Sequence, residues 1–285
     1  MEGEMDMAWC VLILLAVISA VGICAGTGAF AGLCWLWQLP LSVLGCLLGL
    51  LIVVFLVLLI LCAGVDTDQP QKKDSPVFRS VISVVIQVAK PLLGIRLHTK
   101  GLENTPKDGR FLLVCNHIND LDPPMLLHCF RKSQLAFVSK RENSTMFLVG
   151  KAMHKLMCQL INRENDREAL KTILTCVRLI EEDQVSIAVF PEGYTSMDGL
   201  LHPFRNGVFK IAQKAHVPIV VCTLQNTNKV LRNALHLKPT HVHVHLVGVI
   251  PPEELKGQTA VAVGNRVHAM MAEDLGPELV LQETT

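Results

Sequence analysis

The chain has 285 residues, 51% of them hydrophobic, and a mean hydropathy of +0.41. A chain this apolar is not an ordinary soluble domain. The apolar excess is concentrated at one end. Residues 1–65 hold three acids and no base, so the net charge of +1 for the whole chain becomes +4 for residues 66–285. A mildly basic body suits an anionic membrane surface or lipid, and it falls well short of a nucleic-acid-binding protein.

The ten cysteines show no C-x-x-C spacing, and four of them lie between Cys10 and Cys46. Cysteines of this kind behave as small apolar residues in a reduced or lipid setting. The spacing therefore predicts neither a disulfide framework nor a zinc site.

The N-terminal region contains no charged residue and no histidine from Ala8 to Val65. One helical crossing of a bilayer needs about 20 apolar residues, so this stretch is long enough for two. Trp35, Trp37 and Pro40 interrupt it, and indole rings favour the membrane interface. We predict two helices, 9–33 and 41–63, joined by a tight turn. The alternatives are a signal peptide, which the acidic N-terminus disfavours, and one bent re-entrant segment.

The next segment, 66–97, is predicted to join this hairpin, residues 1–65, to a catalytic domain of residues 98–285. Residues 66–75 form a polar linker. Lys72, Lys73, Arg79 and Lys90 follow the second span, so the positive-inside rule places the domain on the cytoplasmic side.

Residues 76–90 are predicted to form an amphipathic helix that ends at Pro91. Polar residues recur at helical spacing from Arg79 to Lys90, and apolar residues such as Phe78 and Ile82 fill the other face. Such a helix can lie in the membrane interface, with its apolar side toward the acyl chains. The alternative is a surface helix that packs on the domain.

Strands and helices alternate through the rest of the chain. We predict strands at 111–115, 135–138, 185–190 and 219–223, and helices at 123–130, 165–182 and 207–215. This alternation predicts an α/β sandwich around a largely parallel sheet.

A histidine and an aspartate flank the loop that follows the first of these strands. His117 and Asp122 stand five residues apart, and Asp122-Pro123-Pro124 is typical of a helix start. The Asp122 carboxylate can bond one ring nitrogen and leave the other free to accept a proton from a hydroxyl. His117 can also be an ordinary loop histidine, and Asp120 is a rival carboxylate.

Two other patterns have simple explanations. His241, His243 and His245 alternate with apolar residues, which places the three imidazoles on one face of a predicted edge strand. Their spacing suits tetrahedral metal coordination poorly, so we expect a wet polar face. Cys115 is a candidate nucleophile with His117 as its base, but a strand cysteine is more often packed in a core.

Five motifs in order resemble those of the glycerolipid acyltransferases, and of the lysophosphatidic acid acyltransferase family in particular. They span roughly residues 98 to 250. The first, N-H-x-x-x-x-D, is formed by Asn116, His117 and Asp122. The others are Phe137-Val138-Ser139-Lys140-Arg141-Glu142, Leu160-Ile161-Asn162-Arg163, Phe190-Pro191-Glu192-Gly193 and Val217-Pro218-Ile219-Val220.

The resemblance implies a glycerophosphate-acyltransferase-like α/β domain and a matching activity. The fatty acyl group would pass from acyl-CoA or acyl-carrier protein to the hydroxyl of a lysophospholipid. With 1-acylglycerol-3-phosphate as the acceptor, the product would be phosphatidic acid. The expected partners are membrane lipids and these substrates, and no metal or organic cofactor is expected.

The resemblance also implies roles for individual residues. His117 would be the general base, oriented by Asp122, and backbone amides near Glu192 and Gly193 are candidates for holding the oxyanion. The remaining candidates are expected to bind substrate: Asn116, Lys140, Arg163, Phe190, Pro191, Tyr194, Thr195 and Arg205. Of these, Lys140 and Arg163, with Arg205 as a further candidate, would hold the acceptor phosphate.

The third motif departs from the family pattern. It usually continues Thr-Arg-Ser, and this chain has Tyr194-Thr195-Ser196. The missing arginine leaves other lysolipid acceptors open. A membrane-anchored thioesterase or lipase using the same histidine and aspartate, and a non-catalytic lipid binder, are further alternatives. The chain contains no G-x-S-x-G motif, which disfavours a serine hydrolase.

Overall fold

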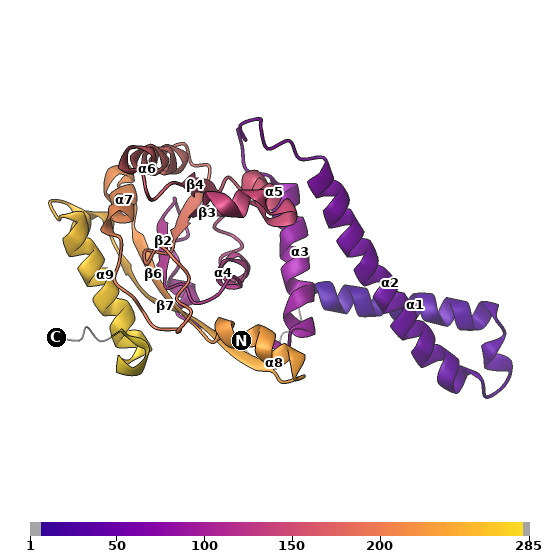
Figure 1. The fold of residues 1–285 in the computed structure, drawn as a ribbon. Helices are drawn as coiled ribbons and strands as arrows, with labels where there is room; N and C mark the ends of the chain where they lie inside the picture. Colours follow the sequence, from indigo (N-terminus) through magenta and orange to yellow (C-terminus); the bar gives the residue numbers. More distant parts are fainter. Residues whose placement is uncertain (1–6, 282–285) are drawn as a thin grey trace.

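The computed structural model describes residues 7–281, which form an α/β domain with two long helices projecting from it (Figure 1). The strands are β1 (Ile95–Lys100), β2 (Leu112–Cys115), β3 (Leu135–Lys140), β4 (Gln159–Ile161), β5 (Ser186–Val189), β6 (Ile219–Gln225) and β7 (Thr240–Ile250). The α-helices are α1 (Met7–Gly26), α2 (Trp35–Ala63), α3 (Pro76–Leu92), α4 (Asp122–Cys129), α5 (Phe147–Lys155), α6 (Asp166–Glu181), α7 (Lys210–Ala215), α8 (Val230–Leu235) and α9 (Ala260–Leu275).

The seven strands form one sheet in the order β1-β7-β6-β2-β5-β3-β4. The β6–β7 pair is antiparallel, and the other pairs are parallel, as predicted for a largely parallel sheet. The segments that follow β2, β3, β4, β5 and β6 therefore begin at the same edge of the sheet. Three of the resembled motifs and Arg163 lie at this edge.

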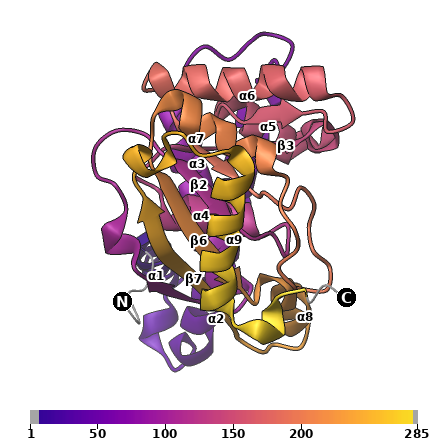
Figure 2. The same ribbon diagram turned by 90° about the vertical axis from the view of Figure 1, so that its left-hand side faces the viewer.

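Helices cover both faces of the sheet (Figures 1 and 2). Alternate residues of β2 show the division. Leu112 and Val114 pack with α6, α7 and α9, whereas Leu113 and Cys115 pack with α3 and α4. All four side chains are fully buried, which explains why a continuous apolar run predicted this strand correctly.

Helices α1 and α2 are each long and apolar enough to cross a membrane. They pack against each other, and the buried side of α1 is lined by residues at a spacing of four: Leu12, Ala16, Ala20 and Cys24. Small side chains at this spacing let two helices approach closely in lipid. Two packed helices of this length and composition are suited to holding the chain at a membrane.

The turn between the two helices differs from the prediction. Residues 27–34 form it, and α2 begins at Trp35 and continues through Pro40. Gly28, at φ +70°, adopts the left-handed conformation that the turn requires. The apparent break at Trp35, Trp37 and Pro40 is instead the first part of a helix, in which Pro40 leaves one carbonyl of the first turn without its usual partner.

Helix α3 begins where predicted, with Ser75 as its N-cap, but its polar side does not face solvent or lipid headgroups. Arg79 donates to Asp74 Oδ2 (2.5 Å) and to the carbonyl of Leu135 (3.1 Å). Lys90 is 8% exposed, and its Nζ atom lies 2.8 Å from Nε2 of His128 in α4. The helix is held between α1 and the domain, so the expectation of an interfacial helix with basic residues at the headgroups is wrong for Arg79 and Lys90.

Several elements of the domain had no counterpart in the prediction. Strand β1 begins at Ile95, three residues before the expected domain boundary, and pairs with β7. The histidine-bearing strand is therefore not an edge strand, because β1 covers its outer side. Helices α5, α8 and α9 were also not predicted.

Candidate active site

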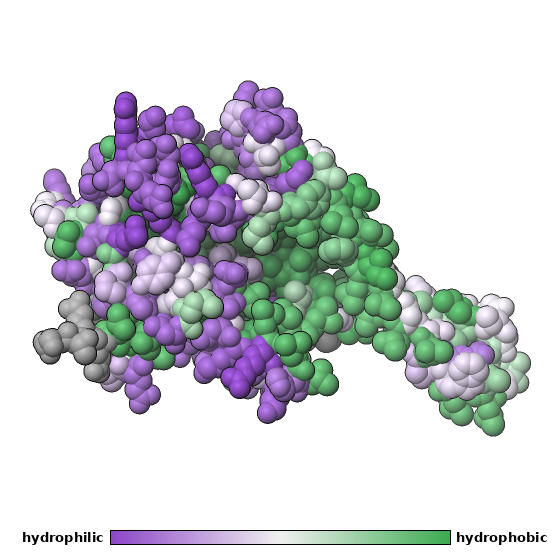
Figure 3. Space-filling view, viewed as in Figure 1, coloured by the Kyte–Doolittle hydropathy of each residue, from purple (hydrophilic) through white to green (hydrophobic). Residues whose placement is uncertain are grey.

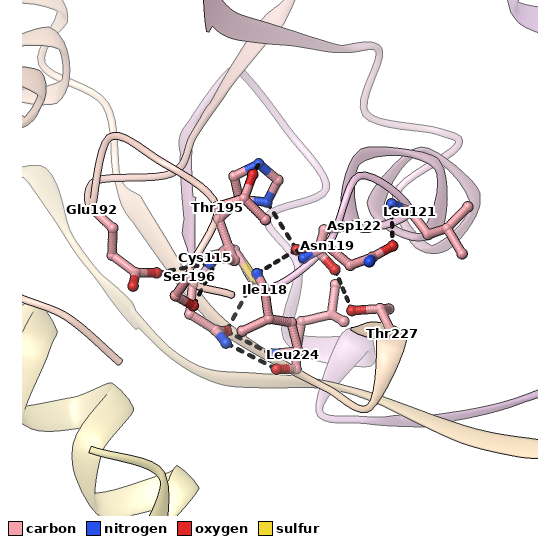
Figure 4. Close-up of polar contacts among 12 residues, drawn as sticks. Cys115, Ile118, Asn119, Leu121, Asp122, Glu192, Thr195, Ser196, Leu224 and Thr227 are labelled. Carbon is pink, nitrogen blue, oxygen red and sulfur yellow. Dashed lines mark hydrogen bonds and ion pairs between the residues drawn. The ribbon is translucent and has the colours of Figure 1, made fainter. Parts of the chain in front are cut away.

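The loop after β2 is organised around the buried carboxylate of Asp122, which is 0% exposed. Its Oδ2 atom accepts hydrogen bonds from His117 Nδ1 (2.9 Å) and from the backbone N–H groups of Ile118 (2.7 Å) and Asn119 (2.8 Å). Its Oδ1 atom accepts one from the hydroxyl of Thr227 (2.5 Å), which follows β6 (Figure 4). Because four donors surround it, this carboxylate is held in one position.

This arrangement fixes the tautomer of His117. The Nδ1 atom must carry a proton to donate to Asp122, so Nε2 is the acceptor nitrogen. The hydroxyl of Thr195 lies 3.0 Å from Nε2 and donates to it. Asp120 is exposed, so the structure selects Asp122 as the partner of His117.

The imidazole of His117 is also held across its ring. It stacks on Phe190 at a centroid distance of 4.1 Å, and Phe190 stacks in turn on Phe137. The carbonyl of His117 accepts hydrogen bonds from the backbone N–H (2.7 Å) and hydroxyl (3.0 Å) of Ser196. Besides Asp122, the Phe190 ring and the Thr195 hydroxyl therefore contact the imidazole, and Ser196 holds the backbone carbonyl of the same residue.

Glu192 joins the base loop to the loop that follows β5. Its side chain is almost fully buried, and one oxygen accepts a hydrogen bond from the backbone N–H of His117 (2.8 Å; Figure 4). The other oxygen accepts one from the backbone N–H of His202 (3.0 Å). Burial raises the pKa of Glu192 to about 7, although these hydrogen bonds and the nearby histidines favour the carboxylate. The Glu192 carboxylate therefore braces the loop.

This raised pKa predicts a pH-dependent stability. The folded protein binds the Glu192 proton more tightly than the unfolded chain, so this contribution to stability is complete below pH 4.5 and declines as the pH rises through about 7. The full change is up to about 3 kcal/mol. We expect Glu192→Gln to flatten the plot of melting temperature against pH between 4.5 and 7.

The comparison with the unmutated protein is essential, because histidines titrate in the same range. The variant should also be less stable below pH 4.5 by about 1–3 kcal/mol, since Gln offers one oxygen to two N–H donors. Thermal unfolding in nanodiscs measures both effects. A variant whose pH slope equals that of the unmutated protein would show that Glu192 does not titrate there.

Of the two predicted oxyanion donors, one is engaged within the loop that follows β5. The backbone N–H of Gly193 donates to the carbonyl of Phe190 (3.1 Å), so this amide is already engaged. Within residues 7–281, the backbone N–H of Glu192 has no such acceptor, and neither do those of Tyr194 and Thr195. These two amides lie in the segment that carries the hydroxyl bound to His117 Nε2.

Two predicted phosphate-binding arginines come together beside this segment. The side chain of Arg205 lies directly over Gly193, where a Cβ atom would approach its Cδ to 2.9 Å. Burial lowers the pKa of Arg163, and the neighbouring positive charge of Arg205 lowers it further. Two guanidinium groups in this position favour an anion between them. Lys140 is exposed at the end of β3. It pairs with Ile161 of β4, which stands two residues before Arg163.

Two predicted substrate-binding residues are engaged within the protein, and a third is exposed. Asn116 is 2% exposed, and its amide both donates to and accepts from the backbone of Leu224 (2.9 and 2.7 Å), which leaves no polar atom for a substrate. Pro191 is buried, and its carbonyl accepts from the N–H of Arg205 (2.8 Å). Tyr194 is 42% exposed, and its ring packs edge-on against His202.

The alternatives for a cysteine nucleophile and a metal receive no support from the geometry. Cys115 is 0% exposed, and burial, followed by the neighbouring Cys222, raises its pKa well above the usual range. A thiol in that state is a poor nucleophile. In the part of the chain that the structure describes, no group of three or more His, Cys, Asp or Glu side chains is arranged to hold a metal ion.

Sequence reasoning missed Thr227 and Ser196, which both hold the base loop. Thr227 is 105 residues from Asp122 along the chain, and nothing in its local pattern indicates the contact. The rule that loops meet at one edge of a parallel sheet gives the one available signal, because Thr227 follows the end of β6.

A mostly parallel sheet therefore carries a carboxylate-oriented histidine at one edge, and Arg205 lies over Gly193 at the same edge. Residues 96–225 match the family model described as Acyltransferase. The match covers somewhat less than half of the chain.

Several matching relatives share one name. The chain is 32% identical to a 1-acyl-sn-glycerol-3-phosphate acyltransferase of Chlamydomonas reinhardtii, over 63% of this chain and 53% of that protein. It is 26% identical to a protein of that name from Borreliella burgdorferi, over 62% of this chain and 72% of that protein. The chain spans about half the length of several of these curated relatives.

One solved structure is similar in fold. The crystal structure of the 1-acyl-sn-glycerophosphate (LPA) acyltransferase PlsC from Thermotoga maritima matches with a TM-score of 0.58 at 22% identity. The match covers 73% of this chain and 81% of that one. At this identity the likeness establishes the fold.

Proposed function

We propose that the protein transfers a fatty acyl group from a thioester donor to the free hydroxyl of a lysophospholipid. The acceptor is 1-acylglycerol-3-phosphate, and the product is phosphatidic acid. The donor is acyl-CoA or acyl-carrier protein. The observation that carries this proposal is the oriented His117–Asp122 dyad, in which His117 Nε2 already accepts a hydrogen bond from the Thr195 hydroxyl (3.0 Å).

In the proposed reaction, the acceptor hydroxyl takes the place of the Thr195 hydroxyl at Nε2. His117 removes the proton as the oxygen attacks the thioester carbonyl, and Asp122 stabilises the resulting imidazolium. The backbone N–H groups of Tyr194 and Thr195 are the proposed donors to the oxyanion. The tetrahedral intermediate then expels the thiolate, which takes the proton back from His117.

The neighbouring arginines support a phosphate-bearing acceptor. Arg163 and Arg205 are close enough to lower the pKa of Arg163, and Arg205 covers Gly193, three residues after the ring that stacks on His117. A phosphate dianion relieves the repulsion between the two guanidinium groups. This pair compensates for the absence of an arginine at Thr195.

The proposed setting is the cytoplasmic leaflet of a membrane. Both ends of the α1–α2 hairpin meet the domain: Trp9 Nε1 donates to the carbonyl of Val88 (3.1 Å), and Lys151 donates to the carbonyl of Val65 (3.0 Å). A hairpin whose ends lie together places the start of α1 and the domain on one side. The bases that follow α2 favour the cytoplasmic side.

A direct assay tests the proposal. Purified protein in nanodiscs is incubated with labelled acyl-CoA, with and without lysophosphatidic acid. We expect a labelled phospholipid that requires the acceptor. Labelled free fatty acid in place of this product would instead support a thioesterase, and neither product would support a lipid-binding protein.

Removing the paired arginines tests the acceptor. We expect Arg163→Ala and Arg205→Ala each to raise the KM for lysophosphatidic acid by about 10- to 100-fold, since a hydrogen bond to a charged group contributes about 1.5–3 kcal/mol. The KM for acyl-CoA should not change. Lys171→Ala, on the exposed side of α6, is the matched control. An unchanged KM for lysophosphatidic acid in both arginine variants would show that these arginines do not bind the acceptor phosphate.

A further inference from the structure

Helix α8 and the turn that follows it expose three leucines on the outside of the domain. Leu231, Leu235 and Leu237 are 56%, 84% and 95% exposed. Leu237 also adopts a left-handed backbone conformation, at φ +53°, which is unfavourable for a branched side chain. With Arg232 and Lys238, these residues form what we call the α8 patch. An apolar cluster of this prominence marks an interaction site.

The surroundings of the α8 patch are positively charged. The sequence has no acidic residue between Asp198 and Glu253, a segment that contains the whole patch. Arg232 and Lys238 are both exposed and make no ion pair within residues 7–281. Leucines beside uncompensated bases suit the boundary between acyl chains and anionic headgroups.

The patch continues toward the membrane hairpin. A groove of about 420 Å³ joins Leu237 and Lys238 to Leu92, the exposed last residue of α3. One helical turn earlier, the carbonyl of Val88 accepts the hydrogen bond from Trp9 of α1. Figure 3 shows the hydrophobic surface of the projecting helices continuing onto this side of the domain. The same bilayer that receives the hairpin therefore lies within reach of the patch.

We propose that the α8 patch is a second membrane contact, which inserts its leucines into the anionic leaflet that holds the hairpin. Thr227, three residues before α8, donates to the carboxylate that orients His117 (2.5 Å). Contact at α8 therefore places the dyad close to the lipid surface from which the acceptor comes. This contact takes over the role that the sequence assigned to the basic residues of α3.

The test uses the full chain, one copy per nanodisc, with a single added cysteine. Leu235→Cys probes the patch, and Leu174→Cys, on the exposed side of α6, is the control. Reaction of each introduced thiol with N-ethylmaleimide is followed by peptide-resolved mass spectrometry, so that native cysteines do not interfere. Leu235 is 84% exposed and Leu174 is 46% exposed, so without lipid contact the thiol at position 235 should react faster.

In nanodiscs of anionic lipid we expect the reverse order, with the thiol of Leu235→Cys at least about tenfold slower than that of Leu174→Cys. Adding Arg232→Gln and Lys238→Gln should accelerate the Leu235→Cys reaction, by about fivefold for each base. A faster reaction at position 235 than at position 174 would overturn the proposal. With one chain per disc, protection by a second copy or a partner protein is excluded. The labelling requires no catalysis, so it stands apart from the test of the proposed function.

A kinetic measurement gives a second readout. The triple variant Leu231→Ser, Leu235→Ser, Leu237→Ser should raise the apparent KM for lysophosphatidic acid in anionic vesicles and leave it unchanged in detergent micelles. The matched control is the double variant Leu170→Ser, Leu174→Ser on α6, which should change neither value. An equal rise of the apparent KM in vesicles and in micelles would contradict a membrane role, because the effect would then not depend on the bilayer.

Discussion

Replacing His117 with alanine should lower kcat by about 10²- to 10⁴-fold or more, while the protein still folds and remains in the membrane. The imidazole is 15% exposed and carries the proton acceptor of the site, so its loss removes the general base. Single-turnover formation of phospholipid from labelled acyl-CoA measures the chemical step.

Two controls separate chemistry from folding in this experiment. The melting temperature of His117→Ala should fall only modestly, because the Asp122 carboxylate keeps its hydrogen bonds from Ile118, Asn119 and Thr227. His202→Ala removes another nearby histidine, one paired with Asp198 (3.0 Å), and should retain most activity. Near-normal turnover by a folded His117→Ala protein would refute the assignment of the base.

The second large effect is expected for Asp122→Asn. The carboxylate accepts four hydrogen bonds, and an asparagine amide would turn one of these acceptors into a donor facing another donor. We expect kcat to fall by about 10²- to 10⁴-fold, because the tautomer of His117 is no longer fixed. We also expect a loss of about 1–3 kcal/mol in the free energy of unfolding.

Asp120→Asn is the matched control, because Asp120 is in the same loop, two residues away, and exposed. It should change neither kcat nor stability. Equal losses of activity in the two variants would show that the loop, rather than the buried carboxylate, controls the histidine. Thermal unfolding and kcat, measured on the same preparations, distinguish these results.

The parts of the fold that follow from local pattern were predicted well. Buried strands such as β2 and β5 are short apolar runs, and a parallel sheet brings the loops after them together. The pairing of His117 with Asp122 follows from a five-residue spacing, but the choice between Asp120 and Asp122 needed the resemblance or the structure.

The failures of prediction have a common physical origin in long-range contacts. Pro40 lies inside α2, although proline usually marks a helix boundary, and the packing of α1 on α2 outweighs this local preference. Arg79 and Lys90 give α3 a polar side that the sequence assigns to water or headgroups. Their partners, the carbonyl of Leu135 and the ring of His128, are remote along the chain.

The contacts of α3 have a mechanical consequence. This helix touches α1 through Val88 and the sheet domain through Arg79 and Lys90, so it is a rigid joint between the anchor and the enzyme. The ten polar residues 66–75 therefore do not act as a tether, and their length does not set the reach of the domain. Under the proposed function, this joint sets the position of His117 relative to the bilayer, and an acceptor that diffuses in the leaflet meets Nε2 at that position.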